Sequence, residues 1–139
     1  MFESDNQKSG EAILCVDDEA VILLSLLQEL KTHLGNHYTY ERATSAESAL
    51  GIIDELDKEG IRVILIISDW LMPGMKGDEF IELVNHSHPE IKAIMITGQA
   101  DESAIERVGS IHSVVAVLKK PWRSDELIKT IKSTCSTKV

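Results

Sequence analysis

The sequence is poor in cysteine and contains no long run of apolar residues. Its two cysteines, Cys15 and Cys135, have neither metal-ligand spacing nor the pattern of a disulfide framework, so we expect both to be reduced thiols. No apolar stretch reaches the roughly 18 residues that a membrane-spanning helix needs, which argues against a membrane protein. The segment from Met1 to Glu11 is polar and lacks the apolar centre of a secretion signal, so a cytoplasmic location is expected.

Positive charge is also in short supply. The chain has 14 lysines and arginines against 23 aspartates and glutamates, a formal charge of -9. Because phosphate backbones are bound by clustered lysine and arginine, direct nucleic acid binding is not expected. Repeats and low-complexity segments are absent, and 139 residues suffice for one domain with its own core. We expect this domain to cover residues 11–135, with a disordered tail over 1–10 and a short tail or linker start over 136–139.

Short apolar runs alternate with amphipathic stretches along the chain. This alternation is typical of βα units around a parallel sheet, so the sequence predicts an α/β fold. The run at 63–67 consists of β-branched residues and leucine and indicates a central strand, whereas the polar run at 38–43 indicates an edge strand. The five expected strands cover 12–16, 38–43, 63–67, 91–96 and 114–118.

The stretches between the strands show helical patterns. Leucines spaced three or four residues apart predict a helix after the first strand. Thr44 followed by Glu47 matches a capping box and predicts the start of the second helix. Ser124 is expected to cap the last helix. Further helices are expected over 78–86 and, from a weaker pattern, over 101–108.

Polar residues gather where the expected strands end. In an open α/β sheet, ligands bind outside the carboxyl ends of the strands. Each of these residues alone has an ordinary interpretation, as a helix N-terminus, a turn or a solvated loop charge. Their joint placement at four strand ends instead favours one functional site. They are Asp17 and Asp18 after the first strand, Asp69 at the end of the third, Thr97 at the end of the fourth, and Lys119 with Lys120 after the fifth.

The residue types at these positions indicate a particular chemistry. Carboxylates brought together repel one another unless a cation lies among them. Two or three carboxylate ligands, with other positions left to water and a phosphate, suit Mg2+. An ammonium and the hydroxyl of Thr97 can hold the oxygens of a phosphoryl group beside the metal. Because an aspartate can accept a phosphoryl group and Asp69 is the most central, we expect phosphoryl transfer to Asp69.

Four motifs in combination resemble those of the receiver domains of two-component response regulators. They are VDDE at 16–19, SDWLMPG at 68–74, ITG at 96–98 and LKKPW at 118–122. The resemblance extends from about Glu11 to about Thr134, nearly the whole chain. It implies a doubly wound five-stranded parallel sheet with strand order 2-1-3-4-5, the flavodoxin-like (βα)5 receiver fold.

The resemblance also implies a metal site. Asp17 and Asp18 resemble the acidic pair that holds Mg2+, and Asp69 resembles the phosphorylated aspartate, which is a metal ligand as well. Leu71 would contribute its backbone carbonyl to the metal. Mg2+ is then the cofactor, and the protein is not an enzyme but a signalling phosphoacceptor that assists its own phosphorylation and dephosphorylation.

The resemblance names the partners too. A sensor histidine kinase or histidine phosphotransfer protein is expected to donate the phosphoryl group from a phosphohistidine. Thr97 resembles the hydroxyl residue that moves towards the phosphate, and Lys120 resembles the phosphate-binding lysine, joined to Pro121 by a cis peptide. Phosphorylation is expected to switch the face formed by the fourth helix, fifth strand and fifth helix. An effector domain or downstream protein and a homodimer stay open as further partners.

Two positions depart from the family pattern. Val117 stands where receivers usually carry a tyrosine or phenylalanine that rotates inward on activation, so the aromatic readout is not expected here. Leu71 replaces a polar side chain often found two residues after the phosphoacceptor. Together with Gln99, it is expected to alter the lifetime of the phosphorylated state.

Three alternatives are weighed against this interpretation. A flavin-binding protein of the same topology needs hydroxyls and N–H groups in its first loop, where Asp17 and Asp18 would repel the flavin phosphate. An aspartate-nucleophile phosphatase carries its nucleophile after the first strand in an Asp-x-Asp pattern, which is absent. A degenerate receiver that serves only as a protein interaction module remains open because of Val117.

Overall fold

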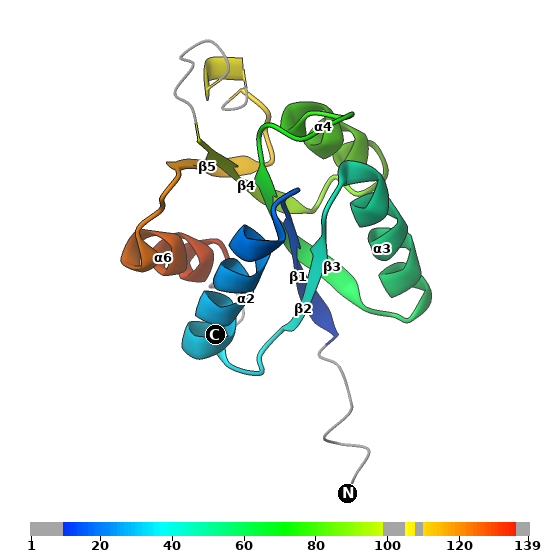
Figure 1. Ribbon diagram of the computed structural model, residues 1–139. Helices are drawn as coiled ribbons and strands as arrows, with labels where there is room; N and C mark the ends of the chain where they lie inside the picture. The colour runs from blue at the N-terminus through cyan, green and yellow to red at the C-terminus, as the bar shows by residue number, and fades with distance from the viewer. Residues whose placement is uncertain (1–9, 99–104, 108–109, 136–139) are drawn as a thin grey trace, which may run out of the picture.

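The computed structural model describes residues 10–98, 105–107 and 110–135 of the chain. Five parallel strands form one sheet in the order β2-β1-β3-β4-β5, which confirms the predicted topology (Figure 1). Each predicted strand overlaps an observed one, and their ends agree within two residues. The strands are β1 (Glu11–Val16), β2 (Thr39–Ala43), β3 (Arg62–Asp69), β4 (Lys92–Thr97) and β5 (Val114–Lys119).

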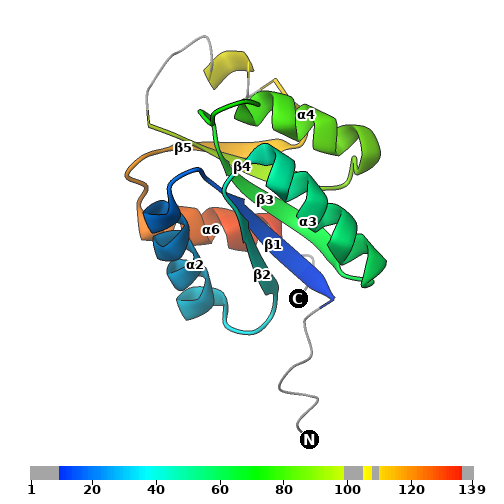
Figure 2. The same ribbon diagram turned by 45° about the vertical axis from the view of Figure 1, so that its right-hand side comes forward.

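Helices cover both faces of the sheet. As Figure 2 shows, α2 and α6 lie on one face, and α3 and α4 lie on the other. This arrangement follows from right-handed βα crossovers, which reverse sides where the strand order reverses. The helices are α2 (Ala20–Leu34), α3 (Ala46–Lys58), α4 (Gly77–Ser87) and α6 (Ser124–Thr134).

Each central strand supplies side chains to two separate cores. In β1, Leu14 packs beneath α3 and α4, whereas its neighbour Ile13 packs beneath α2 and α6. In β3, Ile66 and Ile67 divide between the two cores in the same way. Successive side chains of a strand point to opposite faces, so a strand covered on both sides must be apolar throughout. This explains the unbroken apolar run predicted to be central.

Two helix starts differ from their predictions. The N-cap of α3 is Ser45, not Thr44, and the Ser45 hydroxyl accepts a hydrogen bond of 3.0 Å from the Ser48 N–H. A cap must sit on the last extended residue, and Ser45 has that conformation. Ser124 is the first residue of α6 rather than its cap, because Arg123 holds the extended N-cap position.

Some predictions fall outside the described residues. The expected tails at 1–10 and 136–139 lie there except for Gly10, whose carbonyl oxygen accepts a hydrogen bond from the Arg62 N–H. Of the helix expected over 101–108, residues 105–107 are described and are helical. Gln99 is not described. Within the described part of the chain, every helix is too short or too polar to cross a membrane.

Candidate functional site

The segments that follow four of the strands meet at one edge of the sheet. Backbone hydrogen bonds hold these strand ends in register. The Trp70 N–H, just past β3, donates to the Ile96 oxygen of β4 at 2.9 Å. The Lys120 N–H, just past β5, donates to the Thr97 oxygen at 2.8 Å. The parallel sheet therefore brings together residues that are far apart in the sequence.

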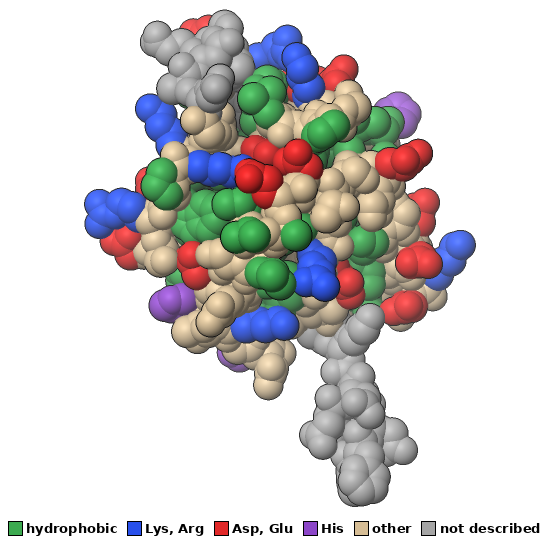
Figure 3. All heavy atoms as spheres, viewed as in Figure 1, with side chains coloured by type: hydrophobic (Ala, Val, Ile, Leu, Met, Phe, Trp, Pro, Cys, Tyr) green, Lys and Arg blue, Asp and Glu red, His purple; other side chains and the backbone are tan. Residues whose placement is uncertain are grey.

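Three carboxylates converge at this edge. Asp17, Asp18 and Asp69 each offer one oxygen, and these oxygens all lie within 4.8 Å of one another. Asp17 and Asp69 are buried, with 3% and 7% of their surface exposed, whereas Asp18 is exposed. Acidic and basic side chains lie next to each other over this region of the molecule (Figure 3). The cluster is thus closed on the protein side and open to solvent through Asp18.

Lys120 extends into the carboxylate cluster. Its Nζ atom lies 2.9 Å from an Asp17 oxygen and 3.4 Å from an Asp69 oxygen. Glu19 approaches less closely, at 3.9 Å. Burial lowers the pKa of Lys120, but its hydrogen bond to Asp17 and the charge of Asp69 outweigh burial, so the pKa is raised overall. The ammonium therefore stays charged, whereas Lys119 is exposed and takes no part in these ion pairs.

Asp69 is held in an environment that disfavours its charge. Burial and the nearby charge of Asp17 raise the pKa of Asp69. Lys120 and a backbone hydrogen bond from Leu71 act in the opposite direction without cancelling the rise. One ammonium is thus too little positive charge for this group of carboxylates. Hard oxygen donors at this spacing, with excess negative charge, fit a divalent cation such as Mg2+.

The two other predicted site residues lie at the same edge. Thr97 is buried at the end of β4, the strand that pairs directly with β3. The Leu71 N–H donates a hydrogen bond to the Asp69 carboxylate, which places the backbone of Leu71 at the site, and the residue is 48% exposed. The prediction that the Leu71 carbonyl binds a metal stays a prediction. The predicted cis peptide between Lys120 and Pro121 is present. All predicted residues therefore come together at one end of the sheet.

Gly77 supports the cluster and was not predicted to do so. Its N–H donates to the Trp70 oxygen at 2.8 Å. A Cβ at this position would lie 2.6 Å from the Asp69 backbone oxygen and 2.5 Å from the Met95 Cε atom. Only glycine allows the start of α4 to approach the end of β3 so closely. In the sequence, Gly77 is only a glycine just before the helix expected over 78–86, and this position does not show that its backbone contacts the end of β3.

An ion pair beside the cluster was also missed. The buried Asp78 carboxylate accepts two hydrogen bonds from Arg107 through Oδ2. Its Oδ1 atom is buried and has no partner within the described ranges. The Arg107 guanidinium lies 5.8 Å from the centroid of the Trp70 ring. Arg107 thus connects the helical turn at 105–107 to the residue that follows Asp69, and no sequence spacing signals this link.

A second link holds the segment after Lys120. The Trp122 indole N–H points at both Glu29 oxygens, at 3.0 and 3.2 Å. Glu29 belongs to α2, so this bond fastens the β5–α6 connection to the helix that follows Asp17 and Asp18. The backbone on both sides of the Lys120 ion pair is therefore fixed.

The family model and the related sequences all point to the same family of domains. A family model described as the response regulator receiver domain matches residues 13–132. The chain is 32% identical over 131 residues to the sensor kinase CckA of Brucella abortus, an alignment that covers 94% of the chain and 13% of the kinase. It is 30% identical over 126 residues to the probable chemotaxis protein CheY of Rhizobium etli, covering 87% of the chain and 89% of that protein.

Solved structures similar to this chain are receiver domains as well. The signal receiver domain of an HD domain-containing protein from Pseudomonas fluorescens Pf-5 superimposes with a TM-score of 0.79 at 27% identity, covering 94% of this chain and 97% of that one. The beryllofluoride-activated NtrC4 receiver domain dimer gives 0.78 at 25% identity, covering 91% and 97%. The chain spans only 13% of CckA and 24% of the hydrogenase transcriptional regulatory protein HoxA of Cupriavidus necator.

Proposed function

Because this chain belongs to the family of response regulator receiver domains, we propose that it is a phosphoacceptor in a two-component phosphorelay, with Asp69 as the residue that receives the phosphoryl group. The observation that carries the proposal is the convergence of three carboxylates and one ammonium at a single sheet edge. Asp69 is the nucleophile because it ends the central strand, and burial and the nearby charge of Asp17 raise its pKa.

The metal site would be formed by Asp17, Asp18, Asp69 and the backbone carbonyl of Leu71. The close approach of three carboxylate oxygens supports this assignment. When bound, Mg2+ would neutralise the negative charge that the phosphoryl group brings into the site. Asp17 and Asp18 come from the loop after β1 and Asp69 from the end of β3, so the ligands would hold two strand ends together.

The protein's own residues then act on the phosphoryl group. An Asp69 oxygen forms the new bond to phosphorus while the phosphorus–nitrogen bond to the donor histidine breaks, and its electron pair stays on the imidazole nitrogen. Lys120, already 3.4 Å from Asp69, holds a phosphoryl oxygen. The hydroxyl of Thr97 donates to another, drawing the end of β4 inward. The chain thereby assists its own phosphorylation and dephosphorylation without turning over a separate substrate.

The partners follow from this chemistry. The donor would be a phosphohistidine on a sensor histidine kinase or a histidine phosphotransfer protein, in the cytoplasm. The movement of Thr97 would switch the face that comprises the helical turn at 105–107, β5 and α6. An effector domain or downstream protein would read that face, since the matching segments of CckA and HoxA are parts of longer proteins. The NtrC4 dimer leaves a homodimer open. We assign the domain to residues 11–135.

A second candidate function rests on Val117. This residue is partly buried against the core beneath α3 and α4, at the position where receivers usually carry an aromatic residue. Without that aromatic residue, a receiver that only binds partners and is never phosphorylated is the alternative. The retained carboxylates and Lys120 favour phosphorylation.

Intact-mass measurement distinguishes a receiver that is phosphorylated on Asp69 from one that only binds partners. The protein is incubated with acetyl phosphate and Mg2+, and we expect an acid-labile adduct of one phosphoryl group. The Asp69→Asn variant should lose the adduct, whereas the matched control Asp54→Asn, an exposed carboxylate on α3, should keep it. Chelation of the metal should abolish the adduct. Absence of the adduct in the wild-type protein, or its persistence in Asp69→Asn, contradicts the proposal.

A further inference from the structure

The charge of the molecule is divided unequally between its two helical layers. Helices α3 and α4 together carry seven acidic residues and one lysine, whereas α2 and α6 carry three acidic residues and three lysines. Figure 3 shows acidic side chains along the edge where α3 and α4 lie. Most of the net charge of the chain therefore resides on one layer. Such a layer attracts cations and repels nucleic acid, anionic membranes and a second copy of itself.

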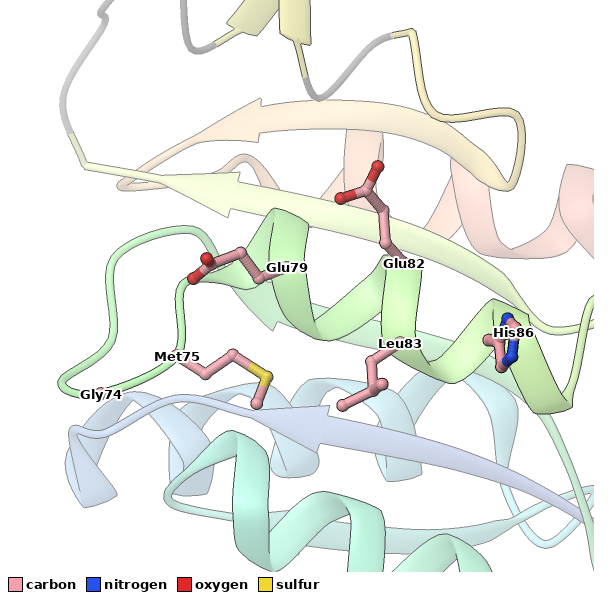
Figure 4. A pocket seen from close by; sticks show the side chains of 6 residues that line it. All are labelled: Gly74, Met75, Glu79, Glu82, Leu83 and His86. Atoms are coloured by element: carbon pink, nitrogen blue, oxygen red, sulfur yellow. The ribbon is translucent and has the colours of Figure 1, made fainter.

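A groove of about 790 Å³ opens on this acidic layer. It is lined by Gly74 and Met75, from the loop after β3, and by the residues Glu79, Glu82, Leu83 and His86 of α4 (Figure 4). Its lining is thus distinct from the carboxylate cluster at the sheet edge.

The floor and rim of the groove differ in character. Met75 and Leu83 extend side by side along the groove, and Leu83 is 46% exposed (Figure 4). Glu79 and Glu82 lie one turn apart on α4; Glu79 extends towards the loop after β3, and Glu82 extends from the side of the helix away from Met75 and Leu83 (Figure 4). An apolar strip with carboxylates on one side of it is the complement of a helix with an apolar stripe and lysines or arginines beside it.

One Glu79 oxygen accepts the Lys76 N–H at 3.1 Å, which leaves its second oxygen and the Glu82 carboxylate for such a partner. Arg107 is a cation near them; its pKa is raised mainly by its hydrogen bonds to Asp78 and by the charge of Asp78, and to a smaller extent by the charges of Glu82 and Glu79. Its guanidinium is, however, committed to Asp78, which accepts both of its hydrogen bonds. The groove therefore keeps its negative potential.

We propose that the groove along α4 is a docking site for a cationic amphipathic helix of a partner protein, whose apolar residues pack on Met75 and Leu83 and whose basic residues pair with Glu79 and Glu82. The proposal does not depend on phosphorylation of Asp69. It concerns a different surface from the one formed by residues 105–107, β5 and α6.

The test uses a synthetic peptide of about 18 residues with leucine and lysine at helical spacing. Titration into the 15N-labelled protein should shift the amide signals of Met75, Glu79, Glu82, Leu83 and His86 most strongly. A peptide with glutamate in place of lysine should not bind, and added salt should weaken the lysine peptide.

Matched variants distinguish peptide binding in the groove from nonspecific electrostatic binding to an acidic protein. Leu83→Ser should weaken binding about tenfold, because an apolar contact is lost. Leu24→Ser should leave binding unchanged, because Leu24 is a leucine of similar exposure, 55%, that lies on α2. The double variant Glu79→Gln/Glu82→Gln should weaken binding about three- to tenfold and retain the helix start, because glutamine can still accept the Lys76 N–H.

Three outcomes would overturn the proposal. The first is that the largest amide shifts lie around Asp17 and Asp69, which would show that the peptide binds the carboxylate cluster instead of the groove. The second is equal weakening by Leu83→Ser and Leu24→Ser, or no binding at all. The third is Leu83-dependent self-association of the protein without peptide, which would make a second copy the occupant.

Discussion

At the scale of single residues, Asp69 combines burial with charge. Its side chain is almost enclosed, it lies near the Asp17 carboxylate, and its pKa is raised by both. A carboxylic acid with a folded-state pKa above its unfolded value binds protons more tightly in the folded state. Its contribution to stability is therefore fully present below the ordinary carboxyl pKa and is lost as the pH rises through the raised value. Ionised Asp69 thus acts against folding.

The Asp69→Asn variant should for this reason melt at a higher temperature than the wild type at neutral pH. The advantage should disappear when the pH falls below the ordinary carboxyl range, where Asp69 is protonated in both states. Thermal unfolding in chelator across a series of pH values measures the effect. Asp54→Asn, on the exposed face of α3, should show no such pH-dependent gain. A destabilised Asp69→Asn at neutral pH would refute this account.

Gly77 offers a second test at this scale. Gly77→Ala should lower the free energy of unfolding by about 1–3 kcal/mol, because the added methyl group overlaps Met95 and the Asp69 backbone. Gly51→Ala is the matched control, since Gly51 lies inside α3 with open space around it and alanine there should stabilise by roughly 0.5–1 kcal/mol. Urea unfolding of both variants should give opposite signs. Equal effects would mean that the crowding at Gly77 is relieved at no cost.

At the scale of elements, Arg107 links the helical turn at 105–107 to the start of α4 and to Trp70. Arg107→Ala should leave the buried Asp78 carboxylate without its partner and uncover the Trp70 ring. We expect a lower melting temperature and an altered Trp70 fluorescence, measured in a Trp122→Phe background. Arg107→Lys, which keeps the charge without the planar fork, should recover stability only in part. Unchanged fluorescence in Arg107→Ala would contradict the contact.

The elements also show which features the sequence could predict. Strands and the carboxylate cluster depend on local apolar runs and on polar residues at strand ends, and both were predicted correctly. The cap of α3 was misplaced because Thr44 and Ser45 are adjacent hydroxyl residues, and only the backbone conformation distinguishes them. The contact between Asp78 and Arg107 joins residues 29 apart with no periodic relation. The closeness of Gly77 to β3 depends on tertiary packing that no local pattern encodes.

At the scale of the whole molecule, a divalent cation should tie separate segments together. Ligands from the loop after β1 and from the end of β3 would be cross-linked, so Mg2+ should stabilise the folded state by about 2.7 kcal/mol at a free concentration 100 times the dissociation constant. Thermal unfolding with and without Mg2+ measures this gain, which Asp69→Asn should reduce. A wild-type melting temperature unaffected by millimolar Mg2+ would argue against a metal site.

The ion pair between Lys120 and Asp17 joins residues 103 positions apart. During synthesis on the ribosome, Asp17 and Asp69 are therefore made well before Lys120, which offsets their charge. The nascent chain holds Asp69, the proposed phosphoacceptor, in an incomplete pocket until β5 has left the exit tunnel and docked. Under the proposed function, competence to accept a phosphoryl group is thus tied to the synthesis of β5 and Lys120, and a product terminated before β5 would hold the acidic residues without the ammonium that offsets their charge.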